Sequence, residues 1–522
     1  PRRCPKLDRL MLSFSLHLPD LAAPAWRWRH DRWTTGTSWI TPLRHPVVIH
    51  SFRQQGATAA ERGAEASNSD VVGHSGTVAV RSVECGDSLL VEMCPGQVLI
   101  TAGVTGTAPL YLVATGETLE ASWNITDLRT RMRPDDLLDR AVARVLTRQH
   151  RYSADTLFST ITRLTERAIA TFTTSGLQLS YPPDALHVAA ARRLREGADP
   201  LTAFAALLTE VIRPWRLPEC RIGVELSGGL DSASVAVTLA DIVGPTVETF
   251  GVLVDGDTGI DQRQRRVCLV DRIRARDSCI DASDHPPFGP TGIRATGHPH
   301  DPSGEFYREV FEALADTACA QGIRVMFTGI GGDEIMALHA NEQADRPPSL
   351  MEEVPWLGER TRRALCEVDD NLAPVAPIPL PSLMAFAIHH PAYLRARIWP
   401  VAPLANPNIV RFAEQLPEAW RGAKNLQREY LRRAGLSAVV THPTRPENFR
   451  QLMQTGLRRH GLPLLDRLLR EGMLLADTGF VDPAALRVAA HLARSTPTVR
   501  SVLCDTLALE LGLRSLLRNP RR

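Results

Sequence analysis

The segment from Val224 to Ser232, VELSGGLDS, constrains the fold of this chain more than any other stretch. An apolar run ends, two glycines follow and a helix-forming run begins, which predicts a strand, a tight turn and a helix. The backbone N–H groups of such a turn converge with those of the helix start and form an anion site, to which the hydroxyls of Ser227 and Ser232 add donors. Asp231 would repel an anion unless a cation lay between them, which is the role of a Mg²⁺ ligand.

A second glycine-rich segment, FTGIGGDE at 327–334, also follows an apolar run. Taken alone, it is explained equally well as a turn whose Asp333 caps a helix. Ligands of parallel sheets bind at the carboxyl ends of the strands, so two such loops are expected at the same edge. Asp333 would then supply a second carboxylate near the same Mg²⁺.

The pattern around these loops alternates between strands and helices. Such alternation predicts a parallel sheet with helices packed against it. The expected strands cover 221–226, 247–254 and 323–328, and the expected helices cover 232–243 and 306–321.

The flanking regions differ in pattern. Short apolar runs between turn residues predict strands up to about residue 125, at 77–80, 88–91, 97–100 and 109–113, with a polar loop at 54–76. Apolar residues three and four apart predict helices at 156–171 and 201–212, and the stretch 380–522 is also read as mostly helical. We therefore expect a first domain over 1–125, a helical connector over 126–200 and a second domain over 201–522. Met11 suggests that residues 1–10 are an upstream extension.

Composition excludes several classes of protein. The 522 residues carry a net charge of only +2, so a nucleic-acid partner is not expected. The nine cysteines form no CxxC pair or zinc-type spacing, which indicates reduced thiols rather than disulfides or a metal cluster. No apolar run is long enough to cross a bilayer, so no membrane association is expected. These features favour a cytoplasmic protein.

The quoted motifs resemble those of a known family. Ser227–Ser232 resembles the pyrophosphate loop of the ATP-pyrophosphatase fold, and with Thr328–Glu334 it resembles the asparagine synthetase superfamily. A similar run with a lysine and an arginine is present from Pro403 to Arg428. Val98–Leu119 more faintly resembles the class II glutaminase domain that precedes the synthetase domain. The resemblance implies an α/β protein. Its first domain would be a degenerate glutaminase-like, Ntn-type αββα domain, and its second an ATP-pyrophosphatase-type parallel-sheet domain with a helical C-terminal region.

The resemblance also implies a reaction in which ATP and Mg²⁺ activate a carboxylate as an acyl-adenylate and an amine then attacks it. It assigns Mg²⁺ to Asp231 and Asp333, and it assigns to Lys424 the neutralisation of phosphate and of the tetrahedral intermediate. Without the resemblance, a solvated surface lysine would be the better interpretation of Lys424. The pyrophosphate would be held by Ser227, Gly228, Gly229, Asp231 and Ser232, and the adenosine by the backbone of Val252, Thr328 and Gly329.

Departures from the family pattern select among its branches. Cys4 is preceded by three residues, and no glutaminase-site segments are visible, so the first domain is expected to be structural. Asparagine synthetases usually carry Glu, and β-lactam synthetases Tyr, where this chain has Ile330, which cannot transfer protons. Glu334 is a weak candidate for the base. The remaining branch is the lasso-peptide macrolactam synthetases. This branch implies a precursor core peptide as substrate, and a leader-recognition protein and a leader peptidase as partners.

Two other functions stay open at this stage. One is an ATP-dependent amide ligase for a small-molecule carboxylate, as in asparagine formation. The other is a scaffold that binds nucleotide or peptide without catalysis. The tryptophans Trp26, Trp28, Trp33 and Trp39 could form a peptide-binding face, although core packing is the favoured interpretation.

Overall fold

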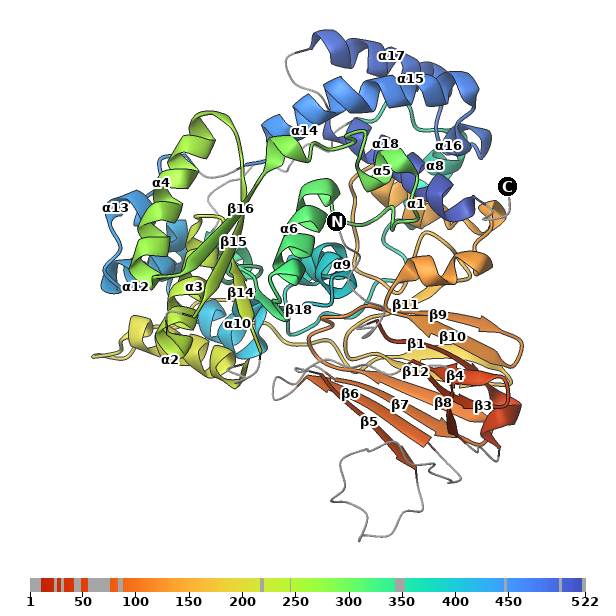
Figure 1. Cartoon of the computed structure of the whole chain (residues 1–522), viewed down its shortest axis with the longest axis horizontal. Coiled ribbons are helices and arrows are strands. Elements are labelled where there is room, and N and C mark those ends of the chain that lie inside the picture. The colour runs from red at the N-terminus through yellow and green to blue at the C-terminus, as the bar shows by residue number, and fades with distance from the viewer. Residues whose placement is uncertain are drawn as a thin grey trace.

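A computed structural model describes most of the chain, with two antiparallel sheets in its first part and a parallel sheet in its second (Figure 1). The described residues are 11–22, 26–29, 32–41, 48–54, 76–82, 88–215, 220–244, 246–342, 353–445, 448–496 and 500–518. The polar loop expected at 54–76 lies almost wholly outside them, and so do residues 1–10. In the described part, no helix is both long and apolar enough to span a membrane.

The first antiparallel sheet has seven strands in the order β11-β9-β10-β1-β4-β3-β2. In β1 the buried residues Phe14 and Leu16 alternate with partly buried ones, as a half-buried strand requires. The strands are β1 (Ser13–His17), β2 (Arg27–Arg29), β3 (Arg32–Thr35), β4 (Ser38–Ile40), β9 (Leu110–Thr115), β10 (Thr118–Ser122) and β11 (Thr162–Leu164).

The second antiparallel sheet has six strands in the order β13-β12-β8-β7-β6-β5. Its buried side chains, among them Val91, Ile100 and Phe172, share one core with the first sheet, so the two sheets pack face to face. The four strands expected between 77 and 113 are confirmed, whereas the helical layers of an αββα domain stay a prediction. The strands are β5 (Val48–Gln54), β6 (Gly76–Ser82), β7 (Ser88–Cys94), β8 (Gln97–Ala102), β12 (Ile169–Thr173) and β13 (Gly176–Ser180).

The helix expected over 156–171 is wrong, because this stretch forms β11 and the beginning of β12. In β12 the buried residues are Ala170 and Phe172, which is the two-residue period of a strand. The β-branched residues that alternate with them, Ile169, Thr171 and Thr173, favour a strand over a helix. The region 126–200 is therefore not a helical connector: its one α-helix is α1 (Asp139–Leu146), and β11–β13 join the sheets of the first part of the chain.

The parallel sheet has the strand order β16-β15-β14-β17-β18. The three strands expected from sequence are β14 (Ile222–Glu225), β15 (Glu248–Leu253) and β17 (Val325–Phe327), joined by β16 (Arg276–Asp281) and β18 (Trp399–Val401). Helices α3 and α4 pack together against β14 and β15, whereas α6 and α9 pack together against β15, β16 and β18. These helices are α3 (Leu230–Val243), α4 (Gly256–Ile273), α6 (Arg308–Ala320) and α9 (Leu380–Arg395).

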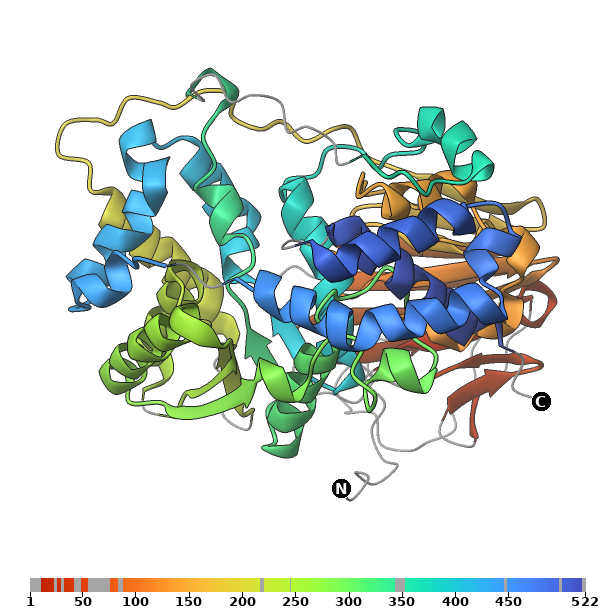
Figure 2. The same ribbon diagram turned by 90° about the horizontal axis from the view of Figure 1, so that it is seen from above.

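The expected helical C-terminal region is confirmed, and part of it covers the first part of the chain. Figure 2 shows the blue C-terminal helices lying over the orange first part of the chain. Helix α18 packs against α1, and one apolar core joins their side chains with Tyr111 of β9. The remaining helices are α2 (Pro200–Ile212), α5 (Ile293–Thr296), α7 (Gly332–Ile335), α8 (Glu359–Ala364), α10 (Pro407–Glu414), α11 (Glu418–Arg421), α12 (Asn425–Arg433), α13 (Ala438–Thr441), α14 (Arg450–Gly456), α15 (Leu462–Glu471), α16 (Leu474–Asp477), α17 (Pro483–Ser495) and α18 (Ser501–Leu517).

Candidate active site

The two glycine-rich loops lie side by side because β14 and β17 are neighbours at the point where the strand order reverses. Their glycines allow a close approach of the two backbones. A Cβ on Gly329 would lie 2.8 Å from the Ser232 nitrogen, and one on Gly332 would lie 2.2 Å from Oδ1 of Asp231. A side chain at either position would push the loops apart, so the packing of this site requires glycine at 329 and 332.

The first loop is closed by its own serines. Gly228 has a φ of 94°, which L-residues rarely adopt. Ser227 N–H donates to Oγ of Ser232 at 3.2 Å, and Gly229 N–H donates to Oγ of Ser227 at 3.1 Å. Helix α3 begins at Leu230, so the first-turn N–H groups that lack intrahelical acceptors border the loop. The serines thus fix the shape of the loop beside the first turn of α3, and binding of an anion at Ser227–Ser232 stays a prediction.

Helix α4 holds this loop from behind through two buried side chains that the sequence analysis missed. Nε2 of Gln262 donates to the carbonyls of Ser227 at 3.0 Å and of Val252 at 2.9 Å. Nε of Arg265 donates to the Gly228 carbonyl at 3.0 Å. These hydrogen bonds hold the carbonyl groups of Ser227 and Gly228 toward α4, away from the side where an anion would bind. The sequence held one signal for these two residues: Gln262 and Arg265 are three positions apart in a helix, a spacing that places both side chains on one face.

Three charged residues converge in front of the loops. Nζ of Lys424 lies 2.6 Å from Oδ2 of Asp231 and 2.6 Å from Oδ1 of Asp333, and Gln427 donates to Oδ1 of Asp231 at 2.8 Å. Burial raises the pKa of Asp231 and Asp333 raises it further, against the lowering effect of Lys424. Burial alone would lower the pKa of Lys424, but both carboxylates raise it, so the lysine is charged. The structure therefore brings together the residues that the sequence singled out at three distant positions.

Lys424 is presented by a strained piece of backbone. Ala423 and Lys424 both have positive φ values, 49° and 59°, which cost non-glycine residues free energy. Arg428 fixes this turn, since its Nε donates to the Ala423 carbonyl at 2.6 Å and its NH1 to the Thr441 carbonyl. Asn425 donates to the Ala419 carbonyl at 2.9 Å. These contacts hold the ammonium group beside the loops.

Glu334 and Ile330 differ in the chemistry that they offer. Burial raises the pKa of Glu334, and the charges of Asp333 and Asp231 add to this rise. Ile330 packs into an apolar cluster with Tyr152 and Met384 and has no group that could move a proton. The role of Glu334 as a base stays a prediction.

The backbone positions predicted to hold adenosine lie at the same edge of the sheet. The Val252 carbonyl already accepts from Gln262, and Thr328 N–H donates to the Val401 carbonyl at 2.8 Å. The Oγ1 atom of Thr328 is buried without a partner among the described residues. Gly329 contacts the first loop, as described above. None of these contacts tests adenosine binding, which stays a prediction.

The donor set fits Mg²⁺. This ion takes oxygen ligands and needs only one or two carboxylates when phosphate oxygens supply others. The carboxylates of Asp231 and Asp333 both contact one cation, Nζ of Lys424. The Asp333 side chain is 81% exposed and can exchange this partner for another cation. The described residues hold no group of three or more His, Cys, Asp or Glu side chains suited to a metal. Mg²⁺ held here would therefore depend on the nucleotide.

The tryptophans near the N-terminus mainly serve packing. Trp26 is buried, and Trp33 packs partly buried against the same core, as the favoured interpretation expected. Trp39 lies under the guanidinium of Arg32, 4.8 Å from the ring centroid to its Cζ. The side chain of Trp28 lies outside the described residues.

A comparison with protein families covers the segment that contains this site. Residues 217–467 match the asparagine synthase family, and no curated protein matches the chain. Among solved structures, the U34-tRNA thiolase of Methanococcus maripaludis is 12% identical with a TM-score of 0.28, covering 61% of this chain and 88% of the thiolase. The NMN synthetase of Francisella tularensis is 15% identical with a TM-score of 0.19, covering 27% of this chain and 58% of the synthetase. The matched segment contains both loops and Lys424. Residues 217–467 thus form a domain of the asparagine synthase family, and the chain is an ATP-dependent amide ligase.

Proposed function

We propose that this amide ligase is a lasso-peptide cyclase. In this reaction a side-chain carboxylate of an Asp or Glu in a precursor core peptide attacks the α-phosphorus of ATP, and pyrophosphate leaves. The N-terminal amine of the same peptide then attacks the acyl-adenylate, loses a proton and displaces AMP. The product is a macrolactam closed by an isopeptide bond.

The observation that carries this proposal is the environment of Ile330. Its side chain lies in an apolar cluster where small-molecule members of the family are expected to place a proton-transferring residue. The cluster includes Tyr152, which precedes β11, so the second glycine-rich loop and the first part of the chain share one apolar cluster. An apolar wall at this place favours a substrate that brings its own amine on a large, partly apolar molecule.

The described side chains divide the work as follows. The N–H groups of Ser227–Ser232 bind the pyrophosphate, and Lys424 neutralises charge on the phosphate and then on the oxyanion. A fixed cation of this kind stabilises an oxyanion most when water is excluded. Mg²⁺ bound by Asp231 and Asp333 would add positive charge beside the leaving pyrophosphate. A leader-recognition protein and a leader peptidase would act upstream, to deliver the free core peptide.

The test uses the purified chain with ATP, Mg²⁺ and a leaderless core peptide encoded near the gene. We expect AMP to form together with a peptide lighter by one water. AMP without a change in peptide mass would contradict cyclisation of that peptide. Absence of AMP with the peptide, but AMP formation with aspartate and ammonia, would assign the chain to small-molecule amidation.

A further inference from the structure

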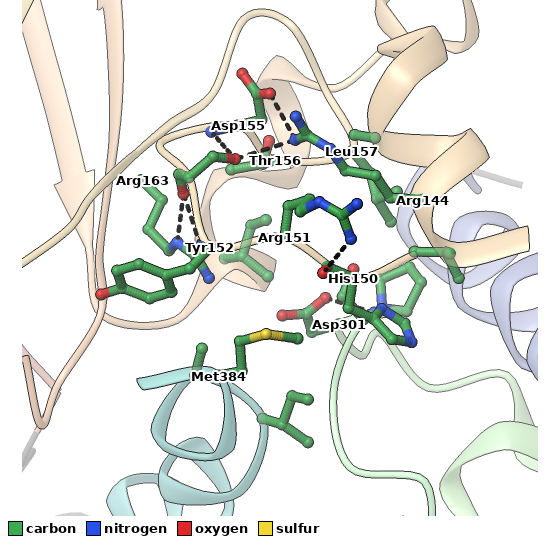
Figure 3. Close-up of a pocket in the computed structure, with 18 of the residues that line it drawn as sticks. Arg144, His150, Arg151, Tyr152, Asp155, Thr156, Leu157, Arg163, Asp301 and Met384 are labelled. Atoms are coloured by element: carbon green, nitrogen blue, oxygen red, sulfur yellow. Dashed lines mark hydrogen bonds and ion pairs between the residues drawn. The ribbon is translucent and has the colours of Figure 1, made fainter. Parts of the chain in front are cut away.

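A cavity of about 110 Å³ lies between the first part of the chain and helix α9 (Figure 3). Its volume is room for several waters or for the end of one side chain, not for a whole peptide. The wall from the first part of the chain includes Tyr111 of β9 and the segment from His150 to Phe158. The opposite wall is formed by Asp301 with its neighbours and by Met384, Ala387 and Ile388 of α9.

We propose that this cavity binds a protonated amine of the peptide substrate, with Asp301 as its counter-ion. The inference rests on the proposed function, since it assumes a peptide substrate. It adds a recognition site outside the two ATP loops and names the chemistry that this site accepts.

The arginines of the cavity are already committed. Arg144 donates to Asp155 at 2.8 Å and to the Val368 carbonyl at 2.8 Å. Arg163 donates to the Ser153 carbonyl at 2.7 Å and covers the ring of Tyr152. Arg151 pairs with Asp369 at 2.6 Å. The positive charges that line the cavity are therefore neutralised or spent on carbonyls, which disfavours an anionic ligand.

The carboxylate of Asp301 is different. Its Oδ1 accepts from Ser303 N–H at 2.9 Å, and among the described residues it forms no ion pair within 4.0 Å. The Tyr111 side chain also hydrogen-bonds to this carboxylate. Burial raises the pKa of Tyr111, and the negative charge of Asp301 raises it further. A carboxylate that has neutral hydrogen-bond partners but no ion pair, beside an aromatic ring in a partly closed cavity, is an environment that binds an ammonium group.

His150 adds no positive charge beside Asp301. Its Nε2 is buried and has no hydrogen-bond partner among the described residues. Burial lowers the pKa of His150, and the positive charges of Arg148 and Arg151 lower it further, so the ring is neutral near pH 7. A neutral imidazole nitrogen can accept from an ammonium group, and the apolar side chains of Met384 and Ile388 suit the methylenes that carry it.

The cavity adjoins the ATP loops in two ways. Tyr152 and Met384 line the cavity and also belong to the apolar cluster around Ile330 of the second loop. The segment that carries Asp301 continues to Glu305, which binds His389, and His389 binds Glu225 at the end of β14. A group held in the cavity is therefore next to the elements that activate the carboxylate, and one peptide can contact both.

The first test measures binding by calorimetry without ATP, using four small peptides. Glycyl-leucine amide carries a terminal amine and Nα-acetyl-lysine amide a side-chain amine; N-acetylglycyl-leucine amide is neutral and N-acetylaspartyl-leucine amide is anionic. We expect at least one amine to bind and the neutral and anionic peptides not to bind. The amine that binds identifies the source of the charge. Equal binding of the neutral or anionic peptides, or no binding of either amine, would overturn the proposal.

Variants place the binding in the cavity. Asp301→Asn should weaken amine binding about tenfold or more, since a charge-assisted hydrogen bond is lost, whereas Glu471→Gln, at an exposed position on α15, should not. Ala387→Phe should fill the cavity and block binding, whereas Ala385→Phe, on the same helix but outside the lining, should not. Unchanged binding in Asp301→Asn and Ala387→Phe would reject the cavity as the site. ATP-dependent AMP formation is a separate measurement, so failure of the cyclase assignment would be distinguished from failure of the amine site.

Discussion

Two charged clusters lie at the carboxyl end of β14, and they differ in how firmly their partners are bound. The first, in front of the loops, joins Asp231 and Asp333 to Lys424, and the Asp333 side chain is 81% exposed. The second lies against α9, where His389 donates to Glu225 at 2.7 Å and to Glu305 at 3.0 Å. The His389 side chain is only 10% exposed. In the first cluster the contact between Lys424 and the exposed Asp333 can be exchanged for a ligand, although Asp231 is only 23% exposed. In the second cluster His389 and Glu305 are 10% and 12% exposed, so no partner is open to exchange in this way.

The difference shows which charges serve chemistry and which serve structure. A charge pair open to solvent contributes little to stability, so its residues are free to bind a charged ligand. Buried charges must keep their partners, because an unpaired one costs several kcal/mol. Variants of the loop cluster should therefore impair catalysis with little effect on folding, and variants of the α9 cluster should do the reverse.

The largest effect is expected for Asp231→Ala, measured as ATP-dependent release of pyrophosphate. The change removes the carboxylate that both loops enclose and that Lys424 and Gln427 contact. Release should be abolished, while circular dichroism remains that of the wild type. The control is Asp135→Asn, an exposed acid outside the site. Retained release in Asp231→Ala would remove the Mg²⁺ assignment.

Lys424→Met should reduce product formation about 100-fold or more, the usual cost of losing a group that stabilises an oxyanion. The thioether keeps the length of the side chain but not its charge. ATP binding, followed by equilibrium dialysis, should persist because the N–H groups of Ser227–Ser232 are unchanged. Arg432→Met, in the exposed end of α12, is the matched control. A near-normal rate in Lys424→Met would exclude the lysine from the reaction.

The α9 cluster should respond in stability rather than in rate. His389→Leu leaves two buried carboxylates without their cation and should lower the free energy of unfolding by about 3 kcal/mol or more. Urea unfolding measures it, with His298→Gln at an exposed histidine as control. A loss below about 1 kcal/mol would mean that this cluster is as loosely paired as the loop cluster.

The same cluster predicts a dependence of stability on pH. Burial would lower the pKa of His389, but Glu225 and Glu305 raise it to about 10. The unfolded histidine titrates near 6.5. Because the folded pKa is higher, the contribution of His389 is complete below about pH 6.5 and is lost as the pH rises toward 10. Unfolding at pH 7, 8 and 9 should show this decline in the wild type and a smaller one in His389→Leu.

Sequence patterns anticipated the loop cluster well and the α9 cluster not at all. The glycine turns at Ser227–Ser232 and 329–332 are local signals, and the parallel sheet follows from the alternation of strands and helices. Glu225 and His389 are 164 residues apart, and each is unremarkable in its own segment, so only the packing of α9 on the sheet brings them together. The mistaken helix at 156–171 has a similar cause. The spacing of its apolar residues fits both the helical and the strand period, and only the pairing of β12 with β8, distant in sequence, decides for the strand.

The smallest effect is expected for Ala423→Gly, which tests how the loop cluster positions its lysine. Glycine removes a left-handed strain of about 1 kcal/mol, but it adds backbone freedom to the unfolded chain worth 0.4–1 kcal/mol. The two nearly cancel, so the free energy of unfolding should change by less than about 1 kcal/mol. Product formation should fall only a few-fold, because Arg428 still holds the turn through the carbonyls at 423 and 441. A loss of product formation as large as that of Lys424→Met would show that the backbone at residue 423, rather than Arg428, fixes the position of Lys424. The loop cluster would then depend on a strained backbone as strictly as the α9 cluster depends on its ion pairs.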